Sequence, residues 1–229
     1  MKKEVIVMSL GGSLIIPDEV DVPLLEKFRK VLLKNTRKYK FVVVCGGGSI
    51  ARKYINALKS SGKNSNFQSF AGISATRMNA RFMSYFFGYN QEMGIPHTMK
   101  TVKNYLKTRD IIFCGALEYK PNETSDATSA EIANILRAEF INLTDVAGLY
   151  TKNPKKHKDA RFISKISWTD FNNMANKVKF VPGQHFVLDQ TAAKKILKDK
   201  IPTYILGKDM SQLDNLLNRR KFKGTIISG

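Results

Sequence analysis

Residues 41–53 read Phe-Val-Val-Val-Cys-Gly-Gly-Gly-Ser-Ile-Ala-Arg-Lys, an apolar run that passes through three glycines into a segment of helical character. The run of β-branched residues predicts a buried strand, and residues 50–58 predict a helix. Gly46, Gly47 and Gly48 lack the Cβ atoms that would keep an anion away from the free N–H groups at the start of that helix. Arg52 adds a permanently charged, planar donor near the same helix end. The stretch therefore predicts a strand-to-helix turn that holds a phosphate.

A second glycine turn precedes this one in the chain. Residues 5–10 form another apolar run, and Gly11-Gly12-Ser13 follows it directly. A plain tight turn would explain one pair of glycines, but two glycine clusters after two strands favour an anion site. The chain contains neither the P-loop pattern nor the dinucleotide-binding glycine pattern, so a nucleotide site must be of another design.

Short runs rich in Val and Ile alternate with helical patterns along the whole chain. The predicted strands are residues 5–10, 41–45, 111–114, 140–143, 204–206 and 225–227. The predicted helices are residues 22–33, 50–58, 76–87, 127–138, 191–198 and 212–217. This alternation predicts an α/β fold with a mainly parallel sheet covered on both faces. In such sheets ligands bind beyond the carboxyl ends of the strands, where the glycine turns lie.

The composition is that of one folded domain. The chain has 229 residues, of which 43% are hydrophobic and 25% charged, which excludes a disordered or collagenous chain. No linker divides it, so we expect a single domain over residues 1–229. No apolar run reaches the ~18 residues of a membrane span. The first residues lack the features of a signal peptide, and we expect a cytoplasmic protein.

The net charge points to anionic partners. Lys and Arg number 38 against 19 Asp and Glu, a formal charge of +19. Basic residues concentrate in residues 34–40, 152–158 and 219–223. Solvated basic faces are the plainer reading; nucleic acid, acidic lipid and phosphorylated metabolites all remain open as partners.

Read in order, the motifs resemble those of the amino-acid kinase superfamily, and within it the archaeal-type uridylate (UMP) kinases. The resemblance covers essentially the whole chain. Its fragments are Gly11-Gly12-Ser13, Gly46-Gly47-Gly48 with residues 51–55, Gly72-Ile73 with Thr76-Arg77 and Asn79-Ala80, residues 124–127, residues 144–150, and Gly224-Thr225-Ile226-Ile227.

The resemblance implies an αβα sandwich on a mostly parallel sheet of about eight strands. The amino-terminal half would hold UMP and the carboxyl-terminal half ATP. With Mg²⁺, the γ-phosphoryl group of ATP would pass to UMP in pyrimidine nucleotide (CTP) synthesis. The family assembles as hexamers, so we expect a homo-hexamer with no membrane partner, and nucleic acid is not the expected partner.

The same resemblance assigns site residues by position. Groups at the transferring phosphates, the catalytic set, would be Gly11, Gly12, Arg52 and Asp126. The ATP site would comprise Ser9, Leu10, Gly11, Gly12, Ser13, Gly48, Arg52, Thr144, Asp145, Tyr150 and Asn153. The UMP site would comprise Gly47, Ser69, Tyr119, Lys120, Pro121, Asn122, Glu123, Thr124 and Ser125. No residue is assigned to a protein-held metal.

This sequence departs from the archaeal pattern at several of these positions. Ser9 and Ser69 stand where the family usually has Asp, Ala147 and Asn153 replace two further aspartates, and Asp145 replaces an Asn. Two alternatives to a UMP kinase stay open. One is a kinase of the same superfamily acting on an acid, carbamate or isoprenoid phosphate. The other is a non-catalytic basic protein that senses nucleotides or binds nucleic acid.

Other conspicuous residues favour structural roles. Cys45 and Cys114 each end an apolar run without Cys-x-x-Cys spacing, so we expect buried reduced thiols. The three histidines, at 97, 157 and 185, lack partners at metal-ligand spacing. Trp168 lies at a predicted helix start and should pack in the core or an interface.

Two further features bear on assembly and on nucleotide binding. The aromatic residues between 82 and 87 predict a subunit contact on a helix. Asp189 matches a family position near the nucleotide, and a helix N-cap would explain it equally well.

Overall fold

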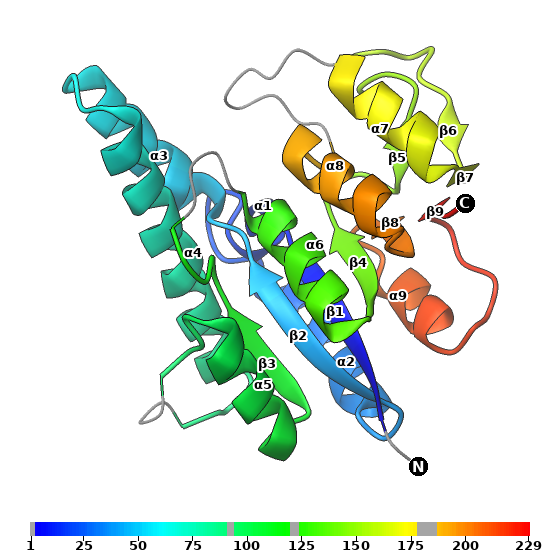
Figure 1. Ribbon diagram of the computed structural model, residues 1–229, viewed down its shortest axis with the longest axis horizontal. Helices are drawn as coiled ribbons and strands as arrows, with labels where there is room; N and C mark the ends of the chain where they lie inside the picture. Colours follow the sequence, from blue (N-terminus) through cyan, green and yellow to red (C-terminus); the bar gives the residue numbers. More distant parts are fainter. Residues whose placement is uncertain (1–2, 91–93, 120–123, 178–186) are drawn as a thin grey trace.

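The computed structural model describes residues 3–90, 94–119, 124–177 and 187–229. Its central sheet has seven strands in the order β3-β2-β1-β4-β8-β9-β7 (Figure 1). Every neighbouring pair is parallel except β8 and β9. The sheet strands are β1 (Glu4–Leu10), β2 (Tyr39–Cys45), β3 (Ile111–Cys114), β4 (Glu139–Leu143), β7 (Lys165–Ile166), β8 (Thr203–Leu206) and β9 (Thr225–Ile227). The predicted mostly parallel sheet is confirmed, with seven strands instead of about eight because β5 (Leu149–Tyr150) and β6 (Phe162–Ile163) pair with each other outside it.

Helices cover both faces of this sheet. They are α1 (Gly12–Ile15), α2 (Val22–Asn35), α3 (Gly48–Ser60), α4 (Ser65–Phe86), α5 (Met99–Thr108), α6 (Ser125–Leu136), α7 (Trp168–Lys177), α8 (Gln190–Asp199) and α9 (Met210–Leu217). Several begin at a side-chain cap, such as Asp21 for α2 and Thr98 for α5. Within the described ranges, none of these helices combines the length and apolar character needed to cross a bilayer.

The alternation of side chains along the strands creates two cores. From β2, Phe41, Val43 and Cys45 pack with α1, α2, α4 and α9 on one face. Val42 and Val44 pack with α5, α6, α7 and α8 on the other. Successive strand residues point to opposite faces, so a strand apolar at every position must be covered on both. The αβα sandwich is thereby confirmed.

Helix α4 begins much earlier than the sequence indicated. The predicted helix covers residues 76–87 and leaves Gly72 outside it, but Asn64 caps a helix of 22 residues that includes Gly72. A Cβ on Gly72 would lie 3.4 Å from Ile55 of α3, so the two helices pack closely here. This tertiary packing overrides the low helix propensity of glycine.

The aromatic residues near the end of α4 mostly belong to the protein's own core, which corrects the expected subunit contact there. Phe87 is 7% exposed, and Phe82 and Phe86 pack against the same core cluster. Tyr85 alone of the four is exposed. The apolar face that α4 presents to solvent includes Tyr85 together with Phe67, Phe70 and Met78.

The structural roles expected of other residues are borne out. Cys45 and Cys114 are buried free thiols in different cores, on opposite faces of the sheet. Burial raises the pKa of the Cys114 thiol to about 12. Ser167 Oγ accepts from the backbone N–H of Asp170 at the start of α7, and Trp168 Nε1 donates to the carbonyl of Ile201.

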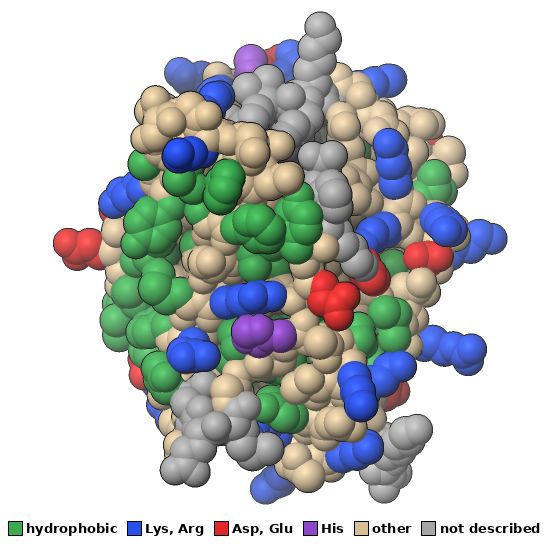
Figure 2. All heavy atoms as spheres, turned by 60° about the vertical axis from the view of Figure 1, so that its left-hand side comes forward, with side chains coloured by type: hydrophobic (Ala, Val, Ile, Leu, Met, Phe, Trp, Pro, Cys, Tyr) green, Lys and Arg blue, Asp and Glu red, His purple; other side chains and the backbone are tan. Residues whose placement is uncertain are grey.

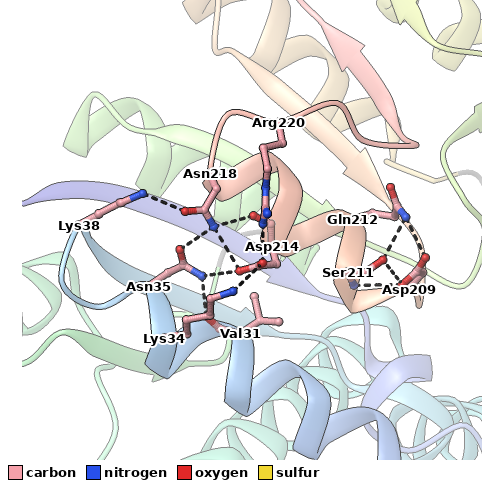
Figure 3. Close-up of polar contacts among 10 residues, drawn as sticks. All are labelled: Val31, Lys34, Asn35, Lys38, Asp209, Ser211, Gln212, Asp214, Asn218 and Arg220. Carbon is pink, nitrogen blue, oxygen red and sulfur yellow. Dashed lines mark hydrogen bonds and ion pairs between the residues drawn. The ribbon is translucent and has the colours of Figure 1, made fainter.

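Two basic stretches that are distant in sequence lie side by side in the fold. Asp214 of α9 accepts from Lys34 of α2 at 2.9 Å and from Arg220 at 2.7 Å (Figure 3). Asn35 and Asn218 complete the network. Residues 34–40 and 219–223 therefore form one surface, in which Asp214 neutralises part of the charge and ties α2 to α9.

Candidate functional site

The two glycine turns interlock at the carboxyl end of the sheet. Leu10 and Cys45 are register partners on β1 and β2, so the turns that follow them start side by side. A Cβ on Gly12 would lie 2.0 Å from the backbone N of Gly48. Gly48 has a φ of 63°, and its own Cβ would lie 2.6 Å from the carbonyl oxygen of Gly12. Only glycine at both positions allows the backbones to approach this closely.

Helix α3 starts directly from this junction. Gly47 is its N-cap residue and supplies no side-chain cap. Its first-turn N–H groups and the helix dipole make this end suited to an anion. Arg52 lies one turn beyond Gly48 and is exposed, and no described acidic side chain pairs with it. Residues four apart share a helix face, and side chains lean towards the N-terminus, so Arg52 lies on the Gly48 side of α3.

The carboxyl group of Asp126 lies beside the first glycine turn, which follows β1. Ser9 Oγ donates to Asp126 Oδ1 at 2.6 Å, which joins the end of β1 to the first turn of α6. Asp126 is half-buried. Burial, together with the negative charge of Asp189, raises the pKa of Asp126 to about 7, and the Ser9 hydrogen bond opposes this shift only in part. Asp126 thus changes its charge near neutral pH, where a phosphate group would add a further negative charge.

Replacing Asp126 with asparagine is expected to stabilise the protein near pH 8 and to change its stability little near pH 4. In the unfolded chain Asp126 ionises near its ordinary pKa of 3.8, whereas in the folded protein it keeps its proton until about pH 7. Wild-type stability is therefore lost as the pH rises through that window, and a neutral asparagine avoids the loss. We expect roughly 2 kcal/mol at pH 8, about half of the full linkage because the side chain is partly solvated.

Urea denaturation of the two proteins across this pH range measures the difference. Asp18→Asn, at an exposed carboxylate, is the control. A stability difference that stays constant with pH would rule out a raised pKa for Asp126.

The predicted acceptor residues lie around the start of α6 and along α4. Thr124 caps α6, since its Oγ1 accepts from the N–H of Ala127 at 3.1 Å, and it donates its hydroxyl proton to Asp189. Ser125 is the first residue of α6, and Ser69 lies on α4; both are half-buried. The predicted residues Lys120, Pro121, Asn122 and Glu123 lie outside the described residues.

Asp189 explains how the two helix starts are joined. Its Oδ1 accepts from the N–H groups of Thr191 and Ala192, so it is the N-cap of α8. Its Oδ2 accepts from Thr124. A hydroxyl has a single proton, so Thr124 can donate to a phosphate only after releasing Asp189.

A cavity of about 580 Å³ lies beyond the carboxyl end of β4. Four of the eleven residues predicted for the ATP site line it: Thr144, Asp145, Tyr150 and Asn153. Leu149, Met174 and Val187 give the cavity an apolar part, and Lys152, Lys155, Lys156 and Lys177 give it a positively charged part. An apolar wall with cationic groups beside it suits a phosphorylated aromatic ligand.

Sequence reasoning missed several members of this site. Lys155 forms an ion pair with Asp145, and both residues line the cavity. The basic run at residues 152–158 includes Lys155, but nothing in that run indicated that Lys155 pairs with Asp145. Lys177 and Met174 come from α7, a helix that the periodicity did not predict beyond its start.

The described histidines do not form a metal site. His97 and His157 lie apart from any grouping of three His, Cys, Asp or Glu side chains, and no such grouping exists in the described part of the chain. The pKa of His97 is lowered, first by burial and then by the charges of Arg77 and Arg81. His185 lies outside the described residues.

Comparisons with known proteins agree with this geometry. A profile of the amino acid kinase family matches residues 4–207. The uridylate kinase of Thermococcus gammatolerans is 32% identical over 224 residues, which cover 97% of this chain and 98% of the relative. The uridylate kinase of Thermoplasma volcanium is 34% identical over 217 residues, 93% of either chain.

Solved structures show the same architecture. The crystal structure of the uridylate kinase from Archaeoglobus fulgidus superposes with a TM-score of 0.83 at 28% identity, over 97% of this chain and 99% of the other. The UMP kinase from Ureaplasma parvum superposes with a TM-score of 0.82 over the full length of both chains. At 20% identity, that second likeness concerns the fold alone.

Proposed function

Because the chain belongs to the amino acid kinase family, we propose that it is a UMP kinase that transfers the γ-phosphoryl group of ATP to UMP. One observation carries the proposal: the two glycine turns interlock at the carboxyl end of the sheet, where Ser9 of β1 contacts Asp126 of α6 and a cationic cavity lies beyond the neighbouring strand β4. The whole chain, residues 1–229, acts as one kinase domain of pyrimidine nucleotide synthesis in the cytoplasm.

The arrangement suits a reaction that needs positioning and charge neutralisation. A phosphate oxygen of UMP attacks the γ-phosphorus of ATP, the bond to the β,γ-bridging oxygen breaks, and UDP and ADP leave. The backbone at Gly11, Gly12 and Gly48, the start of α3 and Arg52 would stabilise the negative charge of the transferring group. Ser9 and Asp126 would hold the first glycine turn beside them.

The cavity residues fit an ATP molecule. Thr144, Asp145, Tyr150 and Asn153 would surround the adenosine, and lysines such as Lys155 and Lys177 would neutralise phosphates. Mg²⁺ is usually held by substrate phosphates with one or two carboxylates, so it needs no cage of protein ligands. Bound to ATP, the ion would supply further charge neutralisation.

The acceptor would lie against Gly47, Ser69, Tyr119, Thr124 and Ser125. Thr124 and Ser125 lie at the start of α6, Ser69 lies on α4, and Tyr119 packs against Phe70 of α4. Serine and threonine hydroxyls can donate to phosphate and to ribose oxygens. The loss of aspartate at position 69 leaves a shorter, neutral group for the ribose.

An assay of ADP release with a panel of acceptors tests the proposal. The panel contains UMP, the other nucleoside monophosphates, carboxylates, carbamate and isoprenoid phosphates. We expect UMP to give the highest kcat/KM. Turnover of a carboxylate, carbamate or isoprenoid phosphate without turnover of UMP would reject the assignment. Salt-dependent polynucleotide binding without any turnover would instead indicate a non-catalytic binding protein.

The protein is expected to assemble as a homo-hexamer. Hydrophobic side chains gather on the face that includes α3 and α4 (Figure 2). Tyr54 of α3 and Phe67, Phe70, Met78 and Tyr85 of α4 are each about half exposed, and we call these five the α3–α4 face. The four positions on α4 follow helical spacing and form one stripe, which is typical of a contact surface.

Light scattering on the purified protein at micromolar concentration should therefore give six times the 25.9 kDa chain mass. Met78→Glu places a charge in the stripe and should shift the protein to smaller species, whereas Ile135→Glu on α6 should not. A monomeric wild type would contradict this assembly.

A further inference from the structure

Helix α4 holds the backbone of two neighbouring turns at the carboxyl end of the sheet. Asn79, 4% exposed, donates from Nδ2 to the carbonyl of Gly46 at 2.7 Å, in the glycine turn after β2. Thr76 Oγ1 accepts from the N–H of Ala116 at 3.1 Å, in the connection after β3. Two side chains of one helix thus contact both turns.

Arg77 makes the strongest of these contacts. Its Nε donates to the carbonyl of Ala116 at 3.1 Å, and its Nη2 donates to the carbonyl of Leu117 at 2.5 Å. A charged donor forms hydrogen bonds roughly twice as strong as a neutral one, and the planar guanidinium fixes two oxygens at once. The side chain is half-buried. Both of these acceptors are backbone oxygens.

The connection is shaped to accept this contact. A Cβ on Gly115 would lie 2.6 Å from both the backbone N of Arg77 and Oγ1 of Thr76, so the backbone runs directly against α4. Further along, the rings of Tyr119 and Phe70 lie 4.8 Å apart, and the Tyr119 hydroxyl donates to Asn66 at 2.8 Å. Residues 115–119 therefore follow α4 from Arg77 towards the start of the helix.

We infer that Arg77 is a positioning residue for the acceptor site: its guanidinium fixes the connection after β3 in the place that UMP binding requires. The inference rests on the proposed function, because residues 115–119 lead towards Thr124 and Tyr119 is itself a proposed UMP contact. Arg77 acts through the backbone of Ala116 and Leu117 and touches no reacting atom.

Two variants and one control separate positioning from simple charge. Arg77→Met removes the donors and the charge but keeps an unbranched apolar side chain. Arg77→Lys keeps the charge but cannot hold two carbonyls with a planar fork. Arg81→Met removes a matched charge one turn further along α4, where the side chain is exposed and no hydrogen bond of its guanidinium is described. The charges of Arg77 and Arg81 both act on His97, so Arg81→Met also tests whether losing one positive charge near His97 is enough to change the kinetics.

Hydrogen exchange on the ligand-free proteins and steady-state kinetics provide the readouts. Arg77→Met should speed exchange at residues 116–119 and raise KM for UMP about tenfold or more, since charge-assisted hydrogen bonds are lost. KM for ATP should stay within about twofold, because the cavity after β4 is not touched. Arg77→Lys should fall between wild type and Arg77→Met, and Arg81→Met should match wild type.

Several outcomes would overturn the inference. An unchanged KM for UMP in Arg77→Met would remove Arg77 from the acceptor site. A raised KM with unchanged exchange in the ligand-free protein would indicate direct contact with UMP. Equal effects of Arg77→Met and Arg81→Met would indicate long-range charge. If Arg77→Met does not fold, Arg77→Lys decides by the same readouts.

The wild-type assay keeps this inference separate from the proposed function. Without UMP turnover by the wild type, the function fails, while exchange at residues 116–119 still shows whether Arg77 holds the connection.

Discussion

Gly12→Ala is expected to destabilise the protein by about 3 kcal/mol and to lower kcat/KM at least a hundredfold. The added Cβ would lie 2.0 Å from the backbone N of Gly48, 2.5 Å from its Cα and 2.8 Å from the carbonyl carbon of Gly46. All three are backbone atoms, so no rotamer change can relieve the overlap. The turns must separate, and the groups that would surround the transferring phosphate separate with them.

Urea denaturation and steady-state kinetics measure the two effects. Gly62→Ala is the control for the steric overlap: no atom lies within 4 Å of its added Cβ, although its φ of 70°, unlike the helical backbone of Gly12, strains any side chain there. It should cost about 1 kcal/mol of backbone strain and leave the kinetics unchanged. A Gly12→Ala protein with wild-type stability and turnover would show that the close approach of the two turns is dispensable.

Arg52→Ala is expected to lower kcat about a hundredfold, on the order of 3 kcal/mol of transition-state stabilisation. Helix α3 begins at Gly48, two residues before the predicted start at residue 50, so Arg52 lies at the start of its second turn and not in its first. The position stays favourable, because residue 52 lies above residue 48 on one face and its side chain leans back towards it. No described carboxylate forms an ion pair with the Arg52 guanidinium, so the group is available to bind phosphate oxygens.

Lys53→Ala is the matched control for this prediction. Lys53 is equally exposed but is rotated by ~100° around the helix, away from the glycine turns. Steady-state kinetics on both folded variants should show a large loss for Arg52→Ala and little change for Lys53→Ala. Near-wild-type rates for both would exclude Arg52 from the site.

Much of the architecture could be predicted from local pattern. All six apolar runs became strands of the central sheet, because a strand that is apolar at every position is stable only between two helical layers. Both glycine turns lie at the carboxyl edge of the sheet, because parallel strands bring together the turns that follow them. The strands β5, β6 and β7 were missed, since two residues carry no periodicity.

The candidate site was predictable only in part. Thr144, Asp145, Tyr150 and Asn153 lie within ten residues of one another, and the structure keeps them around one cavity. The contacts that hold the site together join distant residues. Ser9 meets Asp126, Thr124 meets Asp189, and Arg77 meets Ala116.

The layered α/β sandwich, the glycine turns and the excess of positive charge follow from the amino-acid sequence, because each depends on residue type and local spacing. Tertiary structure alone decided which polar groups became partners. A hydrogen bond requires two atoms to lie about 3 Å apart, but the two residues can be far apart in the sequence. Which polar groups pair therefore depends on how the folded strands place the residues that follow them. The raised pKa of Asp126 is such a result, since it needs burial and the nearby charge of Asp189. So is the bidentate contact of Arg77, whose partners lie about forty residues further along the chain.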